Sequence, residues 1–370
     1  MLKYVFLFIF FYNLFPQIIY ADTDGCDPVW AIENIKVDEK NFNPTKAKND
    51  AERKSTLKAF NKLLDRIVVT PVGEIKSDYP EMEIEKIETM LNFKLVKNET
   101  TLSNRYLAEF SFCFIPNKVA NYLISKNYSW SELTSRPIII LPVWKTKFGS
   151  RLWRDPNPWK NAFVENLNFH KGLSNQIIPI GRIGVERSID SKLALMKNST
   201  SISRAIKRGG ATRALITVAE VLDNENPQLK TLKIKAILFN DKGDDQGLLY
   251  DKNISLEVSD LSNILSLESQ EIISSMETRW KQANIFDGKM NGDIKVFISA
   301  KNSFEWANGM RTLKNLPGIS KIRTESIHYN GGYVRLWVMG GIKRLVSIIT
   351  EKDLPISGSR DNLILNAGQL

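Results

Sequence analysis

The spacing of hydrophobic residues predicts a succession of strands and helices along the chain. Between residues 45 and 68, Leu57, Phe60, Leu64 and Ile67 recur every third or fourth position and form one apolar stripe, which is typical of a long amphipathic helix. Around this helix we expect a strand at 30–38, a shorter helix at 83–91, strands at 93–97 and 105–115, and a helix at 117–125.

The middle of the chain contains the stretch RPIIILPVW at 136–144, which is almost continuously apolar. Such a run is expected of a strand that is buried on both faces of a sheet. After it we expect a helix, a strand that starts at Gln176, two short helices that end at Arg208, and strands at 211–223, 231–240 and 247–258. This order predicts a mixed sheet with helices packed against it.

The last part of the chain follows a long helix at 261–285 and shows the clearest pattern. We expect a strand at 293–300, a helix marked by Phe304, Ala307, Met310 and Leu313, a hairpin at 319–329 and 332–340, a helix marked by Ile342, Leu345, Val346 and Ile349, and a strand at 361–366. The order βαββαβ predicts a ferredoxin-like arrangement.

We therefore predict a fold of the α+β or α/β class with three small mixed domains, because 370 residues are too many for one small core. The expected segments are a signal peptide at 1–21, an N-terminal α+β domain at 22–133, a central mixed α/β domain at 134–258, a connecting helix at 259–291 and a ferredoxin-like C-terminal domain at 292–370.

The first residues have the pattern of a secretory signal peptide. Lys3 gives a positive start, an apolar run follows from Tyr4 to Tyr12, and Ala21 ends a usable cleavage site. The alternative is a membrane anchor, but the apolar run is shorter than the ~20 residues that span a bilayer. A lipid attached to Cys26 is rejected because no small apolar run precedes it. We expect a periplasmic protein without a transmembrane segment in its mature chain.

Charge and cysteine content each leave two interpretations open. The chain has 51 basic and 41 acidic residues, a net charge of +10, which would attract an exported protein to anionic surfaces. The basic residues are also scattered, as they are when they serve solubility alone. Cys26 and Cys113 can form a disulfide in an oxidising compartment, or they can be two free thiols.

Recognisable catalytic and cofactor motifs are absent from the sequence. Its two histidines, His170 and His328, lie in different predicted domains, and no HExxH, CxxC, GxSxG, GxGxxG or phosphate-loop pattern occurs. Four zinc ligands at suitable spacing are also missing. We expect no cofactor and no metal, and a non-enzymatic protein is favoured over an enzyme.

A tryptophan-rich stretch between residues 141 and 163 is the first candidate site, with Trp153, Arg154, Asp155, Asn157 and Trp159 as its candidate binding residues. Tryptophan and arginine are enriched at binding hot spots, and the stretch follows a core strand, where α/β sheets often bind ligands. The alternative is structural: Asn157 can cap a helix that begins at Pro158, and the tryptophans can pack over the sheet.

Two basic stretches are weaker candidates for anion binding. One contains Arg204, Lys207, Arg208 and Arg213 around a pair of glycines that can end a helix. In the other, Gly340 and Gly341 lead from a strand into a helix, and Lys343 and Arg344 follow them. Backbone N–H groups at such a turn can hold a phosphate or carboxylate, but an ordinary tight turn that needs positive φ also explains the glycines and is the favoured interpretation.

Several of these stretches resemble a bacterial exported family known as domain of unknown function 2066. They are AKNDAERKSTLKAFNKLLDRI, RPIIILPVW with RLWRDPNPW, GGATRALITVAEVL, and the tail that begins FEWANGMRTLKNLPGIS. The resemblance implies a protein of the bacterial envelope and brings no reaction, cofactor or catalytic residue. The middle segment also resembles α/β modules of periplasmic envelope-assembly proteins.

The sequence thus favours an exported, non-enzymatic binding or scaffolding protein of the cell envelope. Its expected partner is an envelope protein or an anionic envelope component, and not a nucleic acid. The alternatives are an enzyme that acts on an envelope polymer or lipid, and a peripheral binder of an anionic membrane surface.

Overall fold

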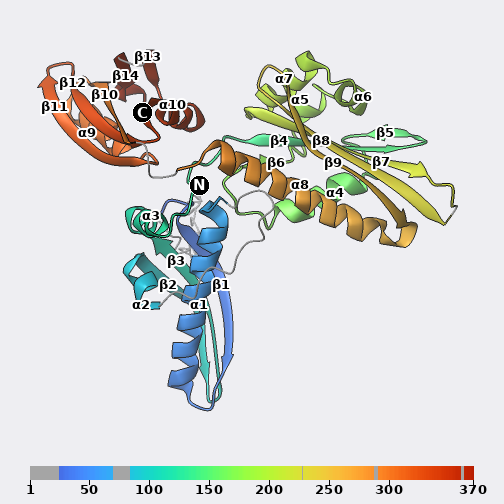
Figure 1. Ribbon diagram of the computed structural model, residues 1–370, viewed down its shortest axis with the longest axis horizontal. Helices are drawn as coiled ribbons and strands as arrows, with labels where there is room; N and C mark the ends of the chain where they lie inside the picture. The colour runs from blue at the N-terminus through green and yellow to red at the C-terminus, as the bar shows by residue number, and fades with distance from the viewer. Residues whose placement is uncertain (1–24, 70–83, 227, 287–290, 360–361) are drawn as a thin grey trace, which may run out of the picture.

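Three separate β-sheets, each built from one contiguous stretch of the chain, organise the molecule. The computed structural model describes residues 25–69, 84–226, 228–286, 291–359 and 362–370. Figure 1 shows the sheets as three lobes around a common junction. The predicted signal peptide at 1–21 lies outside the described residues. The mixed α and β class is confirmed, and the division into three independent domains stays a prediction.

The N-terminal sheet has the strand order β1-β3-β2, and its neighbouring strands are antiparallel. Its elements are β1 (Ala31–Lys40), α1 (Pro44–Ile67), α2 (Ile84–Thr89), β2 (Leu91–Leu102), β3 (Arg105–Phe114) and α3 (Pro116–Ser125). Helix α1 begins where the Asn43 side chain accepts hydrogen bonds from the N–H groups of Thr45 and Lys46. Capping thus fixes the start of the long helix that covers this sheet.

The buried stripe of α1 follows the predicted spacing with one difference. Phe60, Leu64 and Ile67 are buried as expected. Leu57 is only half-buried, and Leu63 lies in the core instead. Both lie within the same helical face, so the difference is a small rotation of the stripe around the helix axis.

A disulfide joins Cys26, which precedes β1, to Cys113 in β3. The two residues are 87 positions apart in the sequence, and Cys113 is buried. Of the two interpretations of the cysteines, the paired one is confirmed.

The central sheet has the strand order β5-β4-β7-β8-β9, and β6 pairs with β4 outside this path. Its strands are β4 (Ile138–Thr146), β5 (Gly149–Arg151), β6 (Gln176–Ile177), β7 (Arg213–Asp223), β8 (Leu229–Phe239) and β9 (Asp245–Glu257). Strand β4 runs parallel to β6 and β7, and the other pairs are antiparallel. The predicted mixed sheet is therefore present.

Strand β4 is buried on both faces, as its apolar run predicts. Ile138 and Ile140 belong to one hydrophobic core, and Ile139, Leu141 and Val143 belong to a second. Helices α4 (Pro158–Leu167) and α8 (Leu261–Ala283) cover the first face, and α5 (Ile183–Glu186), α6 (Ser191–Leu195) and α7 (Ser199–Arg208) cover the other. A short 3₁₀ turn, η1 (Val258–Asp260), leads into α8.

The C-terminal sheet has the strand order β11-β12-β10-β14-β13. Its elements are β10 (Asn291–Ser299), α9 (Ser303–Lys314), β11 (Ile319–His328), β12 (Gly331–Met339), α10 (Gly341–Lys352), β13 (Ile356–Ser359), β14 (Asn362–Asn366) and η2 (Ala367–Gln369). The succession βαββα matches the prediction. A regular right-handed crossover through α10 would return a strand parallel to β12 and antiparallel to β10.

The closing strand of the C-terminal sheet departs from that regular arrangement. Strand β14 runs parallel to β10, because the additional strand β13 precedes it and the chain reverses between the two. The predicted closing strand at 361–366 is therefore one arm of a hairpin. The complete ferredoxin-like arrangement is not confirmed.

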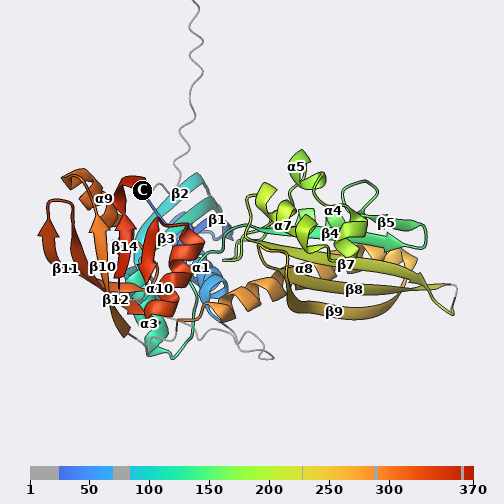
Figure 2. The same ribbon diagram turned by 90° about the horizontal axis from the view of Figure 1, so that it is seen from above.

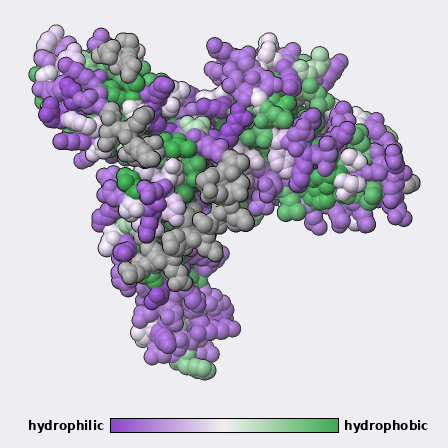
Figure 3. Space-filling view, viewed as in Figure 1, coloured by the Kyte–Doolittle hydropathy of each residue, from purple (hydrophilic) through white to green (hydrophobic). Residues whose placement is uncertain are grey.

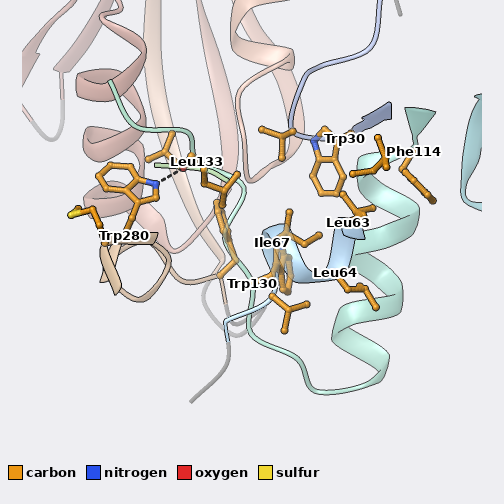
Figure 4. Close-up of a cluster of buried hydrophobic side chains, with 14 of the residues drawn as sticks. Trp30, Leu63, Leu64, Ile67, Phe114, Trp130, Leu133 and Trp280 are labelled. Carbon is orange, nitrogen blue, oxygen red and sulfur yellow. Dashed lines mark hydrogen bonds between the residues drawn. The ribbon is translucent and has the colours of Figure 1, made fainter. Parts of the chain in front are cut away.

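The three sheets meet around Trp130, in the segment between α3 and β4. Trp130 forms backbone bridges with Val68 at the end of α1 and with Phe286 after α8, and its ring stacks on the Phe286 ring at 5.9 Å between centroids. Figure 4 shows Trp130 beside Ile67, and the Trp280 indole donates a hydrogen bond of 2.6 Å to the Leu133 carbonyl. One continuous hydrophobic core thus reaches all three lobes.

Helix α10 attaches the C-terminal sheet to this junction. Its buried Glu351 accepts hydrogen bonds from the Arg136 N–H and from Arg213 Nη2, both at 2.8 Å. Gly318 packs against the Phe286 ring with a φ of +70°, and a side chain at this position would collide with that ring. Figures 1 and 2 show α10 on the inner side of its sheet, toward the rest of the molecule. No described helix has the length and apolar character needed to cross a bilayer.

Candidate functional site

Two residues of the tryptophan-rich stretch lie in the interior. Trp159 is completely buried on α4, and its Nε1 donates a hydrogen bond of 3.1 Å to Thr217 on β7. The buried Asn157 side chain accepts a hydrogen bond from the Lys160 N–H and donates to the carbonyls of Pro142 and Leu152, both at 3.0 Å. These contacts confirm the predicted cap of α4, and burial favours the structural interpretation of both residues.

The exposed part of this stretch is short. Trp153 is half-buried, and its indole donates a hydrogen bond of 2.7 Å to the Ile189 carbonyl. Arg154 and Asp155 are exposed. A hydrogen bond of 2.9 Å from Lys160 lowers the pKa of Asp155 below its usual value. The five candidates thus lie close together, but only Arg154 and Asp155 have exposed side chains. Their role in binding stays a prediction.

The two basic residues that follow the glycine turn before α10, Lys343 and Arg344, lie in different surroundings. Gly340 and Gly341 have φ values of +82° and +67°, and Lys343 is exposed. Arg344 is buried and points to the lobe junction instead, where its Nη1 donates to Asn284 at 3.0 Å and its guanidinium lies 3.9 Å from the Phe286 ring centroid. Burial lowers the pKa of Arg344 to about 10. The predicted anion site at the turn must be corrected to exclude this side chain.

The other basic stretch is divided in a similar way. Arg204, Lys207 and Arg208 line an open hollow of about 550 Å³ on α7, together with Lys242 and three hydroxyl side chains. Arg213 is absent from it because it pairs with Glu351 at the lobe junction. The stretch forms part of a basic surface, and one of its four cations instead holds the fold together.

A groove of about 840 Å³ between the N-terminal lobe and the central lobe is a further candidate site. Helix α1 and the start of β1 form one wall, and α8 with the loop after α4 forms the other. The groove is lined by Gly25, Cys26, Pro28, Ala31, Ile32, Glu33, Asn34, Lys62, Asp65, Arg66, Asn166, Phe169, His170, Lys171, Gly172, Gln270, Ile273, Ser274 and Glu277. No sequence pattern predicts it, because its walls come from distant parts of the chain.

Glu277 on α8 lines this groove and holds the loop that contains Leu173 and Ser174. Its carboxylate accepts hydrogen bonds from the Leu173 N–H at 2.7 Å, the Ser174 N–H at 2.8 Å and the Ser174 hydroxyl at 2.5 Å, and His170 Nε2 lies 3.5 Å away. Burial would raise the pKa of Glu277, but the contacts with His170, Ser174 and Leu173 outweigh it and lower the pKa to about 2. The carboxylate is therefore ionised at neutral pH.

Arg66 at the end of α1 joins the two walls. Its Nε donates to the Lys171 carbonyl at 2.8 Å, and its Nη1 donates to the carbonyls of Pro28, Val29 and Ala31 at 2.8–2.9 Å. Burial lowers the pKa of Arg66 below its usual value. The guanidinium thus acts as a clamp between β1, α1 and the loop after α4, and it fixes the shape of the groove.

The floor of the groove contains Glu277 and Arg66, which are engaged in hydrogen bonds. Its rim is formed by lining residues whose side chains are exposed to solvent. Phe169 is 84% exposed. The exposed charged side chains that line the groove have both signs, with Lys62 and Lys171 against Glu33 and Asp65. An exposed aromatic ring among charges of both signs suits a partner surface with an apolar anchor and polar surroundings. Among the described residues, no three His, Cys, Asp or Glu side chains come together as a metal-binding group.

Comparison with known proteins gives no family for this chain. No family model matches it, and no curated protein matches it. The resemblance to domain of unknown function 2066 therefore stays a prediction.

Solved structures give partial similarities. Lipoprotein GNA1162 from Neisseria meningitidis has 11% identity and a TM-score of 0.27, over 38% of this chain and 97% of that one. Hypothetical protein CT253 from Chlamydia trachomatis has 9% identity and a TM-score of 0.27, over 39% of this chain and 96% of that one. Protein XCC0632 from Xanthomonas campestris, of family model DUF330, has 9% identity and a TM-score of 0.18, over 41% of this chain and 90% of that one.

Proposed function

We propose that this protein is an exported, non-enzymatic binding or scaffolding protein of the bacterial cell envelope, and that it holds its partner in the groove. The observation that carries the proposal is the groove itself: a space of about 840 Å³ between two lobes, with a fixed floor and an exposed rim that has an aromatic ring and charges of both signs. Its volume falls within the range typical of ligand sites. We therefore place the proposed contact surface in the groove and not in the tryptophan-rich stretch.

The ionisable groups on the floor suit a binding site better than a catalytic one. A general acid or base works best when its pKa lies near the working pH. Glu277 has a pKa of about 2, and its oxygens are engaged by the loop that it fixes. Arg66 donates hydrogen bonds to four backbone carbonyls. Both groups shape the groove.

The disulfide supports the exported location. Disulfides form and persist in oxidising compartments and are rare in the cytosol. The pairing of Cys26 with Cys113 therefore fits a protein that has left the cytosol, as the predicted signal peptide requires. We propose the periplasm as that compartment and an envelope protein as the partner.

Photo-crosslinking in cells tests this proposal. A photoreactive residue is placed at Lys62 on one wall of the groove or, in a second strain, at Phe169 on the other wall. We expect both positions to give the same discrete protein adduct, because a partner in the groove touches both walls. Phe304 on α9 is 78% exposed but lies in another lobe, and it serves as the matched control.

The crosslinked species also separates the alternatives. An adduct with a lipid or a glycan at both groove positions would favour the membrane binder or the polymer-directed enzyme. Identical adducts at Phe304 and at the groove positions, or no intermolecular adduct at either wall, would refute the proposal.

A further inference from the structure

The outer face of the C-terminal sheet carries aromatic rings on the neighbouring strands β10 and β12. Side chains alternate along β10 and β12, and Ile294, Val296, Ile298, Val334, Leu336 and Val338 point into the core under α9 and α10. The alternate positions hold Phe297 on β10, and Tyr333 and Trp337 on β12. All three rings are half-buried, so each keeps part of its surface accessible.

The strand register places these rings in two platforms. Tyr333 pairs with Phe297, their ring centroids are 4.9 Å apart, and Phe297 pairs in turn with Ile364, which is 40% exposed. Trp337 forms the second platform, four residues further along β12, or about 13 Å away at the usual rise of a strand. Arg335 lies between the two platforms on the same strand.

Cations surround both platforms. Lys295 Nζ lies 4.2 Å from the Tyr333 ring centroid, and Lys321 Nζ lies 5.0 Å from that of Trp337. Arg323 lies at 6.0 Å from the Trp337 centroid. Cation–π contacts at exposed positions are weak, so an anionic group can draw these side chains aside and expose the rings.

The charges of this face are complementary to an anion. Among its described side chains, the carboxylates Asp293 and Glu325 are both engaged by Arg335, at 2.6 Å and 2.5 Å. Lys295 and Arg323 lie at the longer distance of 3.7 Å from Glu325, and Lys321 adds a further positive charge. The cations therefore outnumber the carboxylates that balance them.

The remainder of the molecule leaves this face open. Helices α9 and α10 lie on the opposite face, and α10 is turned toward the lobe junction, as Figures 1 and 2 show. Asp293, Lys295, Lys321 and Arg323 are all exposed. Figure 3 shows a mainly hydrophilic surface with scattered hydrophobic patches on the side of the molecule that is seen in Figure 1.

We propose that this face binds an acidic glycan strand. The C–H faces of sugar rings stack on the Tyr333 and Phe297 platform and on Trp337. Carboxylates on the glycan, or on peptides attached to it, pair with Lys295, Lys321 and Arg323. Nucleic acid bases also stack on aromatic rings of a sheet. The disulfide fits the proposed location outside the cytosol, away from most nucleic acid, and this favours the glycan.

Sedimentation with purified peptidoglycan sacculi tests the inference, using the chain from residue 22 to residue 370. We expect the protein to pellet with sacculi and to lose at least about tenfold in affinity when Tyr333 and Trp337 are both replaced by Ala, as for hot-spot aromatics. The matched control is Phe304→Ala, an exposed ring on α9. Tyr333→Phe keeps the platform and should retain binding.

A charge reversal keeps the test valid even if the alanine variant is unstable. Lys321→Glu with Arg323→Glu changes two exposed side chains, and it should weaken sedimentation to a similar extent without altering the melting temperature. The inference is overturned if the native chain stays in the supernatant, if the charge-reversed chain pellets as well as the native one, or if a single-stranded oligonucleotide displaces the protein from sacculi. This site is separate from the groove, so its failure would leave the proposed function untouched.

Discussion

At the scale of single residues, buried charged side chains hold distant segments of this chain together. Two buried glutamates, Glu277 and Glu132, have pKa values that are shifted in opposite directions. Glu277 has a lowered pKa, so its stabilising contribution is complete above the ordinary glutamate value and is lost as the pH falls toward 2. Burial raises the pKa of Glu132 to about 7, against the hydrogen bond from the Gly318 N–H. Its contribution therefore falls as the pH rises from about 4.5 to 7.

Replacing Glu277 by Gln should remove one acid-sensitive contribution to stability. Above pH 5 the variant should be about 1–3 kcal/mol less stable, because the donors of Leu173 and Ser174 lose a charged acceptor. This deficit should shrink between about pH 5 and pH 2, since the native carboxylate becomes protonated there. The free energy of unfolding, measured by denaturant titration across this range, checks the prediction. Parallel curves for the two proteins would contradict it.

Local features at this scale could be predicted from the sequence, and the groove could not. Asn157 is followed directly by Pro158, and this order alone predicts the helix cap that the structure contains. In contrast, Arg66 and the Lys171 carbonyl are 105 residues apart, so their hydrogen bond depends on how two lobes pack. Arg344 shows the same limit, because only tertiary packing turns its side chain from the glycine turn to Asn284.

At the scale of elements, the hydrophobic pattern predicts the helices and strands well where one face is buried. Strand β4 and helix α1 confirm their predicted burial. The hairpin of β13 and β14 was missed because β13 (Ile356–Ser359) has only four residues, too few to show alternation. A short strand of this kind changes the direction of the closing strand without leaving a recognisable pattern.

The disulfide is an element-scale constraint whose removal should be measurable. Cys26→Ser should destabilise the N-terminal lobe by about 4 kcal/mol, since the bond closes a long loop in the unfolded chain. Denaturant titration without reductant gives the difference from the native protein. The native protein with reductant is the matched control and should behave like the variant. If the reductant leaves the native midpoint unchanged, the prediction is wrong.

At the scale of the whole molecule, a small number of polar contacts set the position of the C-terminal lobe. Glu351 reaches the segment before β4 through Arg136 and the start of β7 through Arg213. The ring of Phe286 lies beneath both Arg344 and Gly318. The contacts come from α10 and from the turn before β11, so the lobe is held by its inner side.

Glu351→Ala should loosen this attachment while the lobes themselves stay folded. Removing the carboxylate leaves Arg213 without its partner in a mostly buried setting, and such a loss is strongly destabilising at an interface. Small-angle X-ray scattering should show a larger radius of gyration. Lys352→Ala changes the exposed neighbour and should scatter like the native protein. Identical scattering from both variants would mean that the apolar contacts alone hold the lobe.

The position of Trp130 determines how this chain can be cut into fragments. Domain borders usually lie in exposed linkers that few contacts cross. The borders that the sequence predicts at 133/134 and at 291/292 lie close to Trp130, Leu133 and Phe286 instead, and all three are buried. A cut at 133/134 would separate the stacked rings of Trp130 and Phe286, and a cut at 291/292 would separate Phe286 from Arg344 and Gly318. Either cut would expose an apolar surface on each piece. Fragments cut at these borders are therefore expected to aggregate through the exposed apolar surface, even where the full chain keeps each lobe folded.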